Sequence, residues 1–199
     1  MTDAMRFADT ARLRLPVLAL APVVFASLAA PAQAGLPERI VHSARVELAQ
    51  NVHEMPDGSN EAPAIRRYRT AVRWSSPRTA WCGYFVSYVA GEAGAPLGEY
   101  GEGIGAVGEI RRWGKRTKRW RTRPHKGNIA VFRGHVGIVE RVVGSNWIVT
   151  IEGNHSNRVA RVWRSRSEPR GYVRLHPVEP VEAPWDEPQD DPWDSGLAG

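Results

Sequence analysis

Residues 135–154, HVGIVERVVGSNWIVTIEGN, contain two apolar runs separated by a short polar segment with a glycine. Runs rich in Val and Ile and bounded by Gly, Ser and Asn are typical of β-strands, and a short loop between two of them is typical of a hairpin. We interpret the dipeptide GS as a two-residue turn, so that paired residue numbers sum to 289. The stretch therefore predicts an antiparallel hairpin with a defined register.

This register brings three polar side chains to one end of the hairpin. His135 faces Asn154, and Gly137 faces Glu152. Side chains at even spacing share one face of a strand, so His135, Glu152 and Asn154 are expected to lie together. A histidine beside groups that can hold its ring is the arrangement a general base requires. A slip of one residue would move the histidine to the opposite face.

The rest of the chain predicts helices first and strands second. Helices are expected over residues 38–50, 64–72 and 79–92, the last capped by Ser76 or Thr79, and the glycine-rich residues 94–109 are expected to form a loop. Further short strands are expected at residues 128–132, 158–163 and 171–175. This order describes an α+β domain in which N-terminal helices pack on a C-terminal antiparallel meander.

The only cysteine, Cys82, lies near the start of the third predicted helix. The unpaired N–H groups of a first turn and the helix dipole favour negative charge, and both increase the reactive thiolate fraction. The alternative is that Cys82 belongs to an apolar stripe with Phe85, Val86 and Val89 and is only a small buried hydrophobe. The helix pattern alone leaves both interpretations open.

Residues 1–34 have the features of a cleaved signal peptide. A basic start with three arginines precedes the apolar run LPVLALAPVVFASLAA, and AQA then gives a cleavage signal before Gly35. The run is shorter than a spanning helix and contains two prolines, which argues against a membrane anchor. We expect a secreted or periplasmic monomer without a membrane span after cleavage. A single thiol cannot form an internal disulfide, so in an exported chain it is either a crosslink or a reactive group.

The charge is divided unevenly along the mature chain. Residues 35–176 hold 24 Lys and Arg against 12 Asp and Glu, whereas residues 177–199 hold 7 acidic residues and no Lys or Arg. The Pro-rich acidic tail is expected to lack fixed structure. Residues 111–126 include nine Lys or Arg, and we interpret them as part of a loop. We expect this basic segment to bind peptidoglycan or another anionic envelope polymer. The alternatives are that it is only a solvated loop, or that it binds nucleic acid.

Five segments in order, WCGYFVSYV, GNIAVF, GHVGIVERV, IEGNHSN and RGYVRL, resemble the CHAP domains over residues 56–175. These are cysteine- and histidine-dependent amidohydrolases and peptidases with a papain-like core, related to the NlpC/P60 group. The resemblance implies peptidoglycan as substrate, Cys82 as nucleophile and His135 as base. It gives Asn154 the role of orienting the histidine or supporting the site, and Glu152 matches an acidic residue that some members have.

Some features of the site depart from the family pattern or stay open. Trp81 stands where many members have an oxyanion-donating Gln, and we expect it to form a wall of the substrate cleft, with His155 at the rim. Whether Glu152 or Asn154 holds the histidine ring is open. No cofactor is expected, and no metal either, because no Cys or His residues are paired at ligand spacing.

Three other functions compete with a cell-wall hydrolase. The same thiol could transfer an acyl group to an amine, the chain could be a non-catalytic envelope-binding module with a relict site, or it could be an exported nucleic-acid-binding protein. Addition of an amine, thiol reactivity and salt dependence of binding distinguish them.

Overall fold

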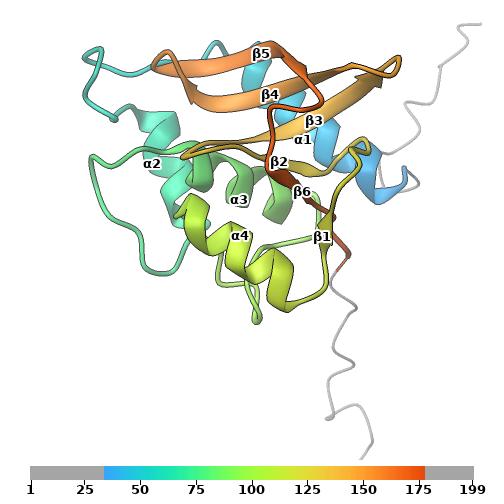
Figure 1. Ribbon diagram of the computed structural model, residues 1–199. Coiled ribbons are helices and arrows are strands. Elements are labelled where there is room, and N and C mark those ends of the chain that lie inside the picture. Colours follow the sequence, from blue (N-terminus) through green and yellow to red (C-terminus); the bar gives the residue numbers. More distant parts are fainter. Residues whose placement is uncertain (1–33, 178–199) are drawn as a thin grey trace, which may run out of the picture. The chain divides into compact units, whose positions relative to one another are not determined.

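The computed structural model describes residues 34–177, in which helices pack against one six-stranded antiparallel sheet (Figure 1). The predicted α+β class is confirmed. The predicted signal peptide and acidic tail lie outside the described residues, apart from Ala34 and Pro177 at their edges. Within the described part, no helix has the length and apolar character that crossing a membrane requires.

The three predicted helices are present. Apolar side chains at helical spacing are buried in each of them, as Ile40, Val41 and Ala44 are in the first. The described residues also form a fourth helix, and the bounds are α1 Leu36–Ala49, α2 Pro63–Thr70, α3 Cys82–Glu92 and α4 Val107–Arg116.

The predicted start of α3 was wrong. The helix begins at Cys82 rather than near residue 79, its N-cap is Trp81, and no side chain caps it. The Thr79 hydroxyl instead donates to the Ser76 carbonyl at 3.0 Å and accepts from Arg69 at 3.3 Å. The residues before Cys82 are therefore a loop held from the side by α2, and Cys82 is the first helical residue.

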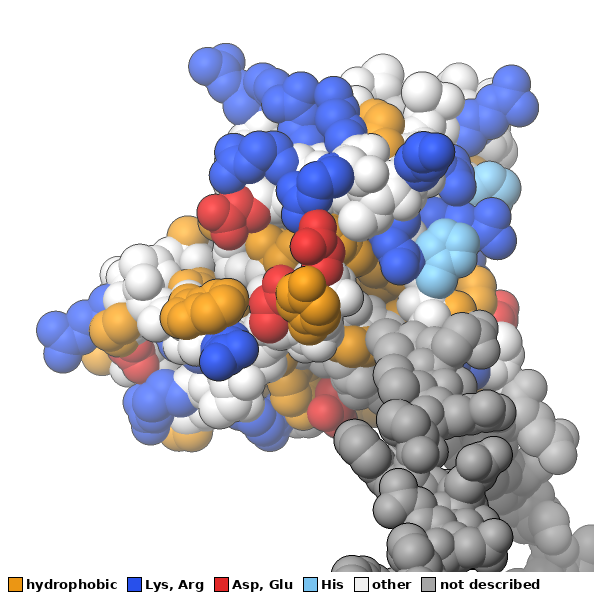
Figure 2. All heavy atoms as spheres, turned by 90° about the horizontal axis from the view of Figure 1, so that it is seen from below, with side chains coloured by type: hydrophobic (Ala, Val, Ile, Leu, Met, Phe, Trp, Pro, Cys, Tyr) orange, Lys and Arg blue, Asp and Glu red, His pale blue; other side chains and the backbone are white. Residues whose placement is uncertain are grey.

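The interpretation of residues 94–126 as loop was partly wrong, because α4 covers residues 107–116. Ile110, Trp113 and Gly114 are buried at helical spacing, while the arginines between them face outward. Half of the basic segment is thus the polar face of an amphipathic helix. In Figure 2, which views the molecule from below, Lys and Arg side chains gather along the upper edge.

The sheet has the strand order β1-β6-β2-β3-β4-β5. Strands β2 to β5 form the predicted meander, and β6 returns to pair with β2. The two-residue strand β1, which pairs with β6, was not predicted. The bounds are β1 Trp120–Arg121, β2 Ile129–Val131, β3 Val136–Val143, β4 Trp147–His155, β5 Arg158–Ser165 and β6 Gly171–Val173.

The hairpin of β3 and β4 reaches the predicted register by a different route. Val143 pairs with Trp147, so the turn has three residues, 144–146, and the predicted two-residue turn was wrong. Nearer the other end, Val139 pairs with Thr150, whose numbers sum to the predicted 289. Between these pairs β3 contains one extra residue, which restores the expected faces at the end where the polar side chains lie.

The extra residue is Glu140, which is buried and bonded by three arginines. Arg45 of α1 donates to it at 2.7 Å, Arg161 of β5 donates two bonds of 2.8 Å, and Arg141 donates one of 3.0 Å. Burial of Glu140 raises its pKa, but the bonds from Arg161 and Arg45 outweigh this effect, so that the pKa lies below its ordinary value. The bulge is therefore fixed by positive charges from α1, from β5 and from the next residue of β3 itself.

Candidate active site

Cys82 occupies the first position of α3, a helix with most of its side chains buried under the sheet. Its side chain is 4% exposed and lines a cleft of about 300 Å³ together with Thr79, Tyr84 and Gly134. The first amides of a helix have no intrahelical partner, and the positive end of the helix dipole lies there. The side chain of Cys82 therefore lies at the end of the helix where backbone donors are free.

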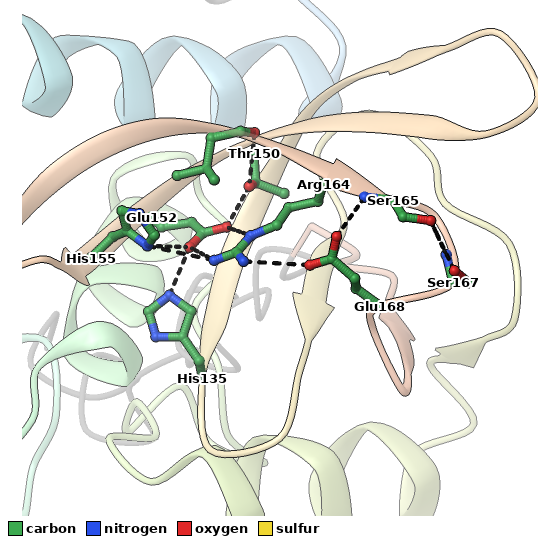
Figure 3. Close-up of polar contacts among 9 residues, drawn as sticks. His135, Thr150, Glu152, His155, Arg164, Ser165, Ser167 and Glu168 are labelled. Carbon is green, nitrogen blue, oxygen red and sulfur yellow. Dashed lines mark hydrogen bonds and ion pairs between the residues drawn. The ribbon is translucent and has the colours of Figure 1, made fainter.

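His135 directly precedes β3 and lies between Cys82 and Glu152. Its Nε2 is 2.9 Å from Oε2 of Glu152, as Figure 3 shows. The side chain of Cys82 also acts on this ring, and its influence raises the pKa of the histidine. The ring is thus influenced by the cysteine of the helix and bonded to a carboxylate of the sheet.

Burial lowers the pKa of His135, but hydrogen bonds and charge interactions with Cys82 and Glu152 raise it to about 9. The imidazolium is therefore the favoured form at neutral pH.

Glu152 is a buried carboxylate held by several donors. Arg164 of β5 binds both of its oxygens, at 3.0 Å and 2.8 Å, and the Thr150 hydroxyl donates to Oε1 (Figure 3). Burial raises the pKa of Glu152, but the bonds from His135, Arg164 and Thr150 lower it to about 2. Glu152 therefore stays charged and fixes the orientation of the histidine ring. The role of Arg164 was not predicted from the sequence.

A glycine on β3 makes room for this carboxylate. A Cβ atom at Gly137 would lie 2.6 Å from Cγ of Glu152, closer than two carbon atoms can approach. On the opposite face of β4, a Cβ at Gly153 would lie 2.5 Å from Cβ of Phe85 in α3. These two glycines let the helix approach the sheet and let Glu152 lie across the neighbouring strand.

Asn154 lies in the same corner of the domain but bonds to the segment before Cys82. In the amide orientation that matches donors with acceptors, its Oδ1 accepts from the Trp81 backbone N–H and its Nδ2 donates to Glu54, both at 3.1 Å. The residue has a φ of 58°, in the left-handed region that Asn tolerates. Of the two residues considered for orienting His135, Glu152 contacts the ring, and Asn154 contacts the residue before the nucleophile.

Trp81 does not line the cleft, contrary to our expectation. Its side chain is 0% exposed, packs against Tyr68 and donates its indole N–H to buried Glu54 at 2.9 Å. A buried tryptophan whose indole N–H has a partner is a typical residue of the hydrophobic core. Trp81 instead anchors the start of α3.

His155 lies at the rim, as its position after Asn154 suggested. It is half-buried, with Nδ1 3.4 Å from Glu152, and it lines a cleft of about 410 Å³ with His135 and Arg133. His135 and Cys82 therefore lie between two hollows, one on the helix side and one on the sheet side. A substrate chain that occupies both would pass over the thiol.

The side chains of His135, Glu152 and His155 bring three potential metal-ligand atoms within 4.8 Å of one another. The wide spacing of these residues in the sequence gave no sign of this cluster. Both oxygens of Glu152 are already bonded by the Arg164 guanidinium, and one of them also contacts His135. The guanidinium group of Arg164 therefore already supplies the positive charge that a metal ion would bring to these three side chains.

Comparison with protein families gives a match to the CHAP domain over residues 74–154. Residues 74–154 are therefore similar to a CHAP domain. The matched segment includes Cys82, His135 and Glu152 and ends at Asn154. CHAP domains are generally hydrolases that act on peptidoglycan. Comparisons with curated proteins and with solved structures gave no match.

Proposed function

We propose that this protein is a secreted or periplasmic cysteine hydrolase that cleaves an amide bond of peptidoglycan. The observation that carries the proposal is the 2.9 Å contact of His135 with buried Glu152, on a ring whose pKa Cys82 also raises. A nucleophile, a base and a group that holds the base are the parts that covalent amide hydrolysis needs.

In the first half of the reaction, the Cys82 thiolate attacks the amide carbonyl carbon. A carbon–sulfur bond forms, and the carbonyl π electrons move to oxygen to give a tetrahedral oxyanion. As the carbonyl reforms, the carbon–nitrogen bond breaks, and His135 gives its proton to the departing amine. The products of this half are a free amine and a thioester on Cys82.

In the second half, water attacks the thioester while neutral His135 accepts its proton. Collapse of the second tetrahedral species breaks the carbon–sulfur bond, releases a carboxylic acid and restores the thiolate with the imidazolium. Glu152 keeps the ring in one orientation in both halves, because its charge persists at neutral pH.

The start of α3 is suited to stabilising the oxyanion. The backbone N–H of Cys82 belongs to the first turn, where amides have no intrahelical partner, and it is adjacent to the attacking sulfur. Removal of one oxyanion donor typically costs about 10²–10³-fold in turnover. The buried Trp81 provides no side-chain donor to the cleft, because its indole N–H bonds Glu54.

Export and the substrate rest on separate support. The signal-like residues 1–34 favour a location outside the cytoplasm, where peptidoglycan lies. The excess of Lys and Arg over Asp and Glu in residues 35–176 suits an anionic polymer. The family match supports the same substrate class.

The test is incubation of the full chain and its Cys82→Ala form with purified peptidoglycan, followed by mass spectrometry of newly exposed termini. New termini produced by the parent alone are expected, and they identify the bond as glycan–peptide or peptide–peptide. Residual turnover of the variant above about one per cent of the parent would exclude Cys82 as nucleophile. Products coupled to an added amine would show acyl transfer instead.

A further inference from the structure

A second cleft lies beside the loop that leads to Cys82. It has a volume of about 1100 Å³ and is bordered by α2 and by residues 72–78. Residues of the same loop line both clefts. Ser75, Pro77 and Arg78 line this one. Ser76 and Thr79 line the cleft that contains Cys82. The two clefts are therefore separated only by the thickness of one loop.

The charge of this cleft is strongly positive. Arg66, Arg69, Arg73 and Arg78 line it, against one acidic side chain, Glu61. Arg73 and Arg78 are exposed, and neither forms an ion pair with any residue of the described part of the chain. Between them lie apolar surfaces of Pro56, Val72 and Pro77.

Arg69 adds a buried positive charge to the cleft. It is 6% exposed and donates to the carbonyls of Asn60, Ser76 and Thr79, at 2.7–3.0 Å. Within residues 34–177 no carboxylate forms an ion pair with it, and its Nε has no hydrogen-bond partner. Burial of a charged group costs free energy when its partners are neutral oxygens. An anion bound in the adjacent cleft would reduce this cost.

We infer that this cleft binds carboxylate groups of the substrate's peptide part while the scissile bond lies over Cys82. The inference rests on the proposed function for the identity of the substrate. Guanidinium groups match carboxylates in planar, paired hydrogen bonds, and the stem peptides of peptidoglycan carry free carboxylates whereas its glycan backbone is mostly neutral. The apolar patches suit the aliphatic parts of the same peptide.

Binding measured without cleavage tests the inference. The probe is the synthetic tripeptide L-Ala-γ-D-Glu-L-Lys, and its counterpart has amidated carboxylates. Binding of both peptides is measured by calorimetry. The parent is the full chain with Cys82→Ala, and the cleft variant carries Arg73→Gln and Arg78→Gln in addition. The control carries Arg123→Gln and Arg170→Gln, two exposed residues with the same loss of charge. Thermal unfolding of each variant verifies that it is folded.

We expect the acidic peptide to bind about tenfold more weakly to the cleft variant, the control to bind as the parent does, and the amidated peptide to bind weakly to all. Equal binding by the cleft variant, or no preference for free carboxylates, would overturn the inference. Displacement of the peptide by poly(glycerol phosphate) at equal charge concentration would also overturn it, in favour of a phosphate polymer. Failure of the proposed function is read separately, as absence of new termini from the active chain.

Discussion

Nε2 of His135 lies 2.9 Å from a carboxylate oxygen of Glu152 that also accepts a bond from Arg164. Together with the influence of Cys82, this contact raises the pKa of His135 to about 9 against the effect of burial. The pH dependence of activity follows from it. We expect the alkaline limb of kcat/KM to lie near pH 9, where the imidazolium is lost.

Replacement of Glu152 by Gln removes the negative charge from this contact and leaves the shape almost unchanged. The alkaline limb is expected to move to lower pH by about one unit or more, because an opposite charge at this distance accounts for shifts of that size. The measurement is the pH profile of iodoacetamide alkylation of Cys82, together with that of kcat/KM. Glu99→Gln, which has the same charge change on the surface, should leave both profiles unchanged; an unshifted limb in Glu152→Gln would refute the assignment.

Stability should depend on pH through the same pair. The pKa of His135 is raised, so its contribution to the free energy of unfolding is complete below about pH 6.5 and is lost as the pH rises through about 9. The pKa of Glu152 is lowered to about 2, so its contribution is present above about pH 4.5 and is lost as the pH falls towards 2. Urea unfolding of the parent and of His135→Ala between pH 6 and 9.5 should show the alkaline loss only in the parent.

Gly137→Ala tests whether Glu152 needs the space across β3. The new methyl group would lie 2.6 Å from Cγ of Glu152, so we expect the side chain of Glu152 to shift and its contact with His135 to be disturbed. Activity is expected to fall about 10²-fold, since misplacement by about 1 Å has that effect, with a loss of about 1–3 kcal/mol in unfolding free energy. Gly91→Ala is the matched control. That site in α3 is open, so the change should stabilise the helix by about 0.5–1 kcal/mol and leave activity intact.

Asn154→Ala distinguishes a residue that holds the nucleophile segment from one that holds the histidine. Loss of its bond to the Trp81 backbone should slow alkylation of Cys82 and lower kcat, while the alkaline limb stays near pH 9. Glu54→Gln, which changes the same cluster through the Trp81 indole, should behave in the same way. A limb displaced as far as in Glu152→Gln would instead mean that Asn154 acts on the ring.

Glu140→Gln tests the bulge. Four hydrogen bonds from three arginines lose their charged acceptor, and we expect the unfolding free energy to fall by about 2–3 kcal/mol, in the range for hydrogen bonds to charged groups. Chemical denaturation is the measurement. Glu38→Gln, which breaks an exposed pair with Lys126, should leave the free energy of unfolding almost unchanged, because solvent screens such pairs. Equal effects of the two substitutions would show that the cluster is not what fixes β3.

Strands β2 to β6 and three helices could be predicted because their apolar residues follow simple periods. The hairpin register was predicted from a turn that does not form, and it agrees at the site end only because Glu140 is an extra residue. No local sequence pattern predicts this bulge reliably. The bulged residue is stabilised by side chains that are distant in the sequence, here Arg45 and Arg161. Helix α4 could have been found, because Ile110 and Trp113 are spaced as in an amphipathic helix within the basic segment.

The site was predicted to different degrees for physical reasons. His135 and Glu152 lie on one hairpin, so the predicted register brought them together, whereas Cys82 was joined to them only by the resemblance to the CHAP domains. Arg164 comes from β5, whose pairing with β4 is interrupted after Glu152, and its contact could not be read from spacing. Burial of Trp81 depends on Glu54, which lies 27 positions earlier and accepts its indole N–H.

The bulge also decides where the domain tolerates attachments. The tip of the hairpin, residues 144–146, is exposed. Glu140 and its arginine partners lie between this tip and the end of the hairpin that holds His135 and Glu152. A fluorophore or an affinity peptide joined at Ser145 would move only the strand ends on its own side of Glu140. The tip is therefore the place to immobilise the protein on a sensor or to attach a label, with the residues around Cys82 and His135 left free.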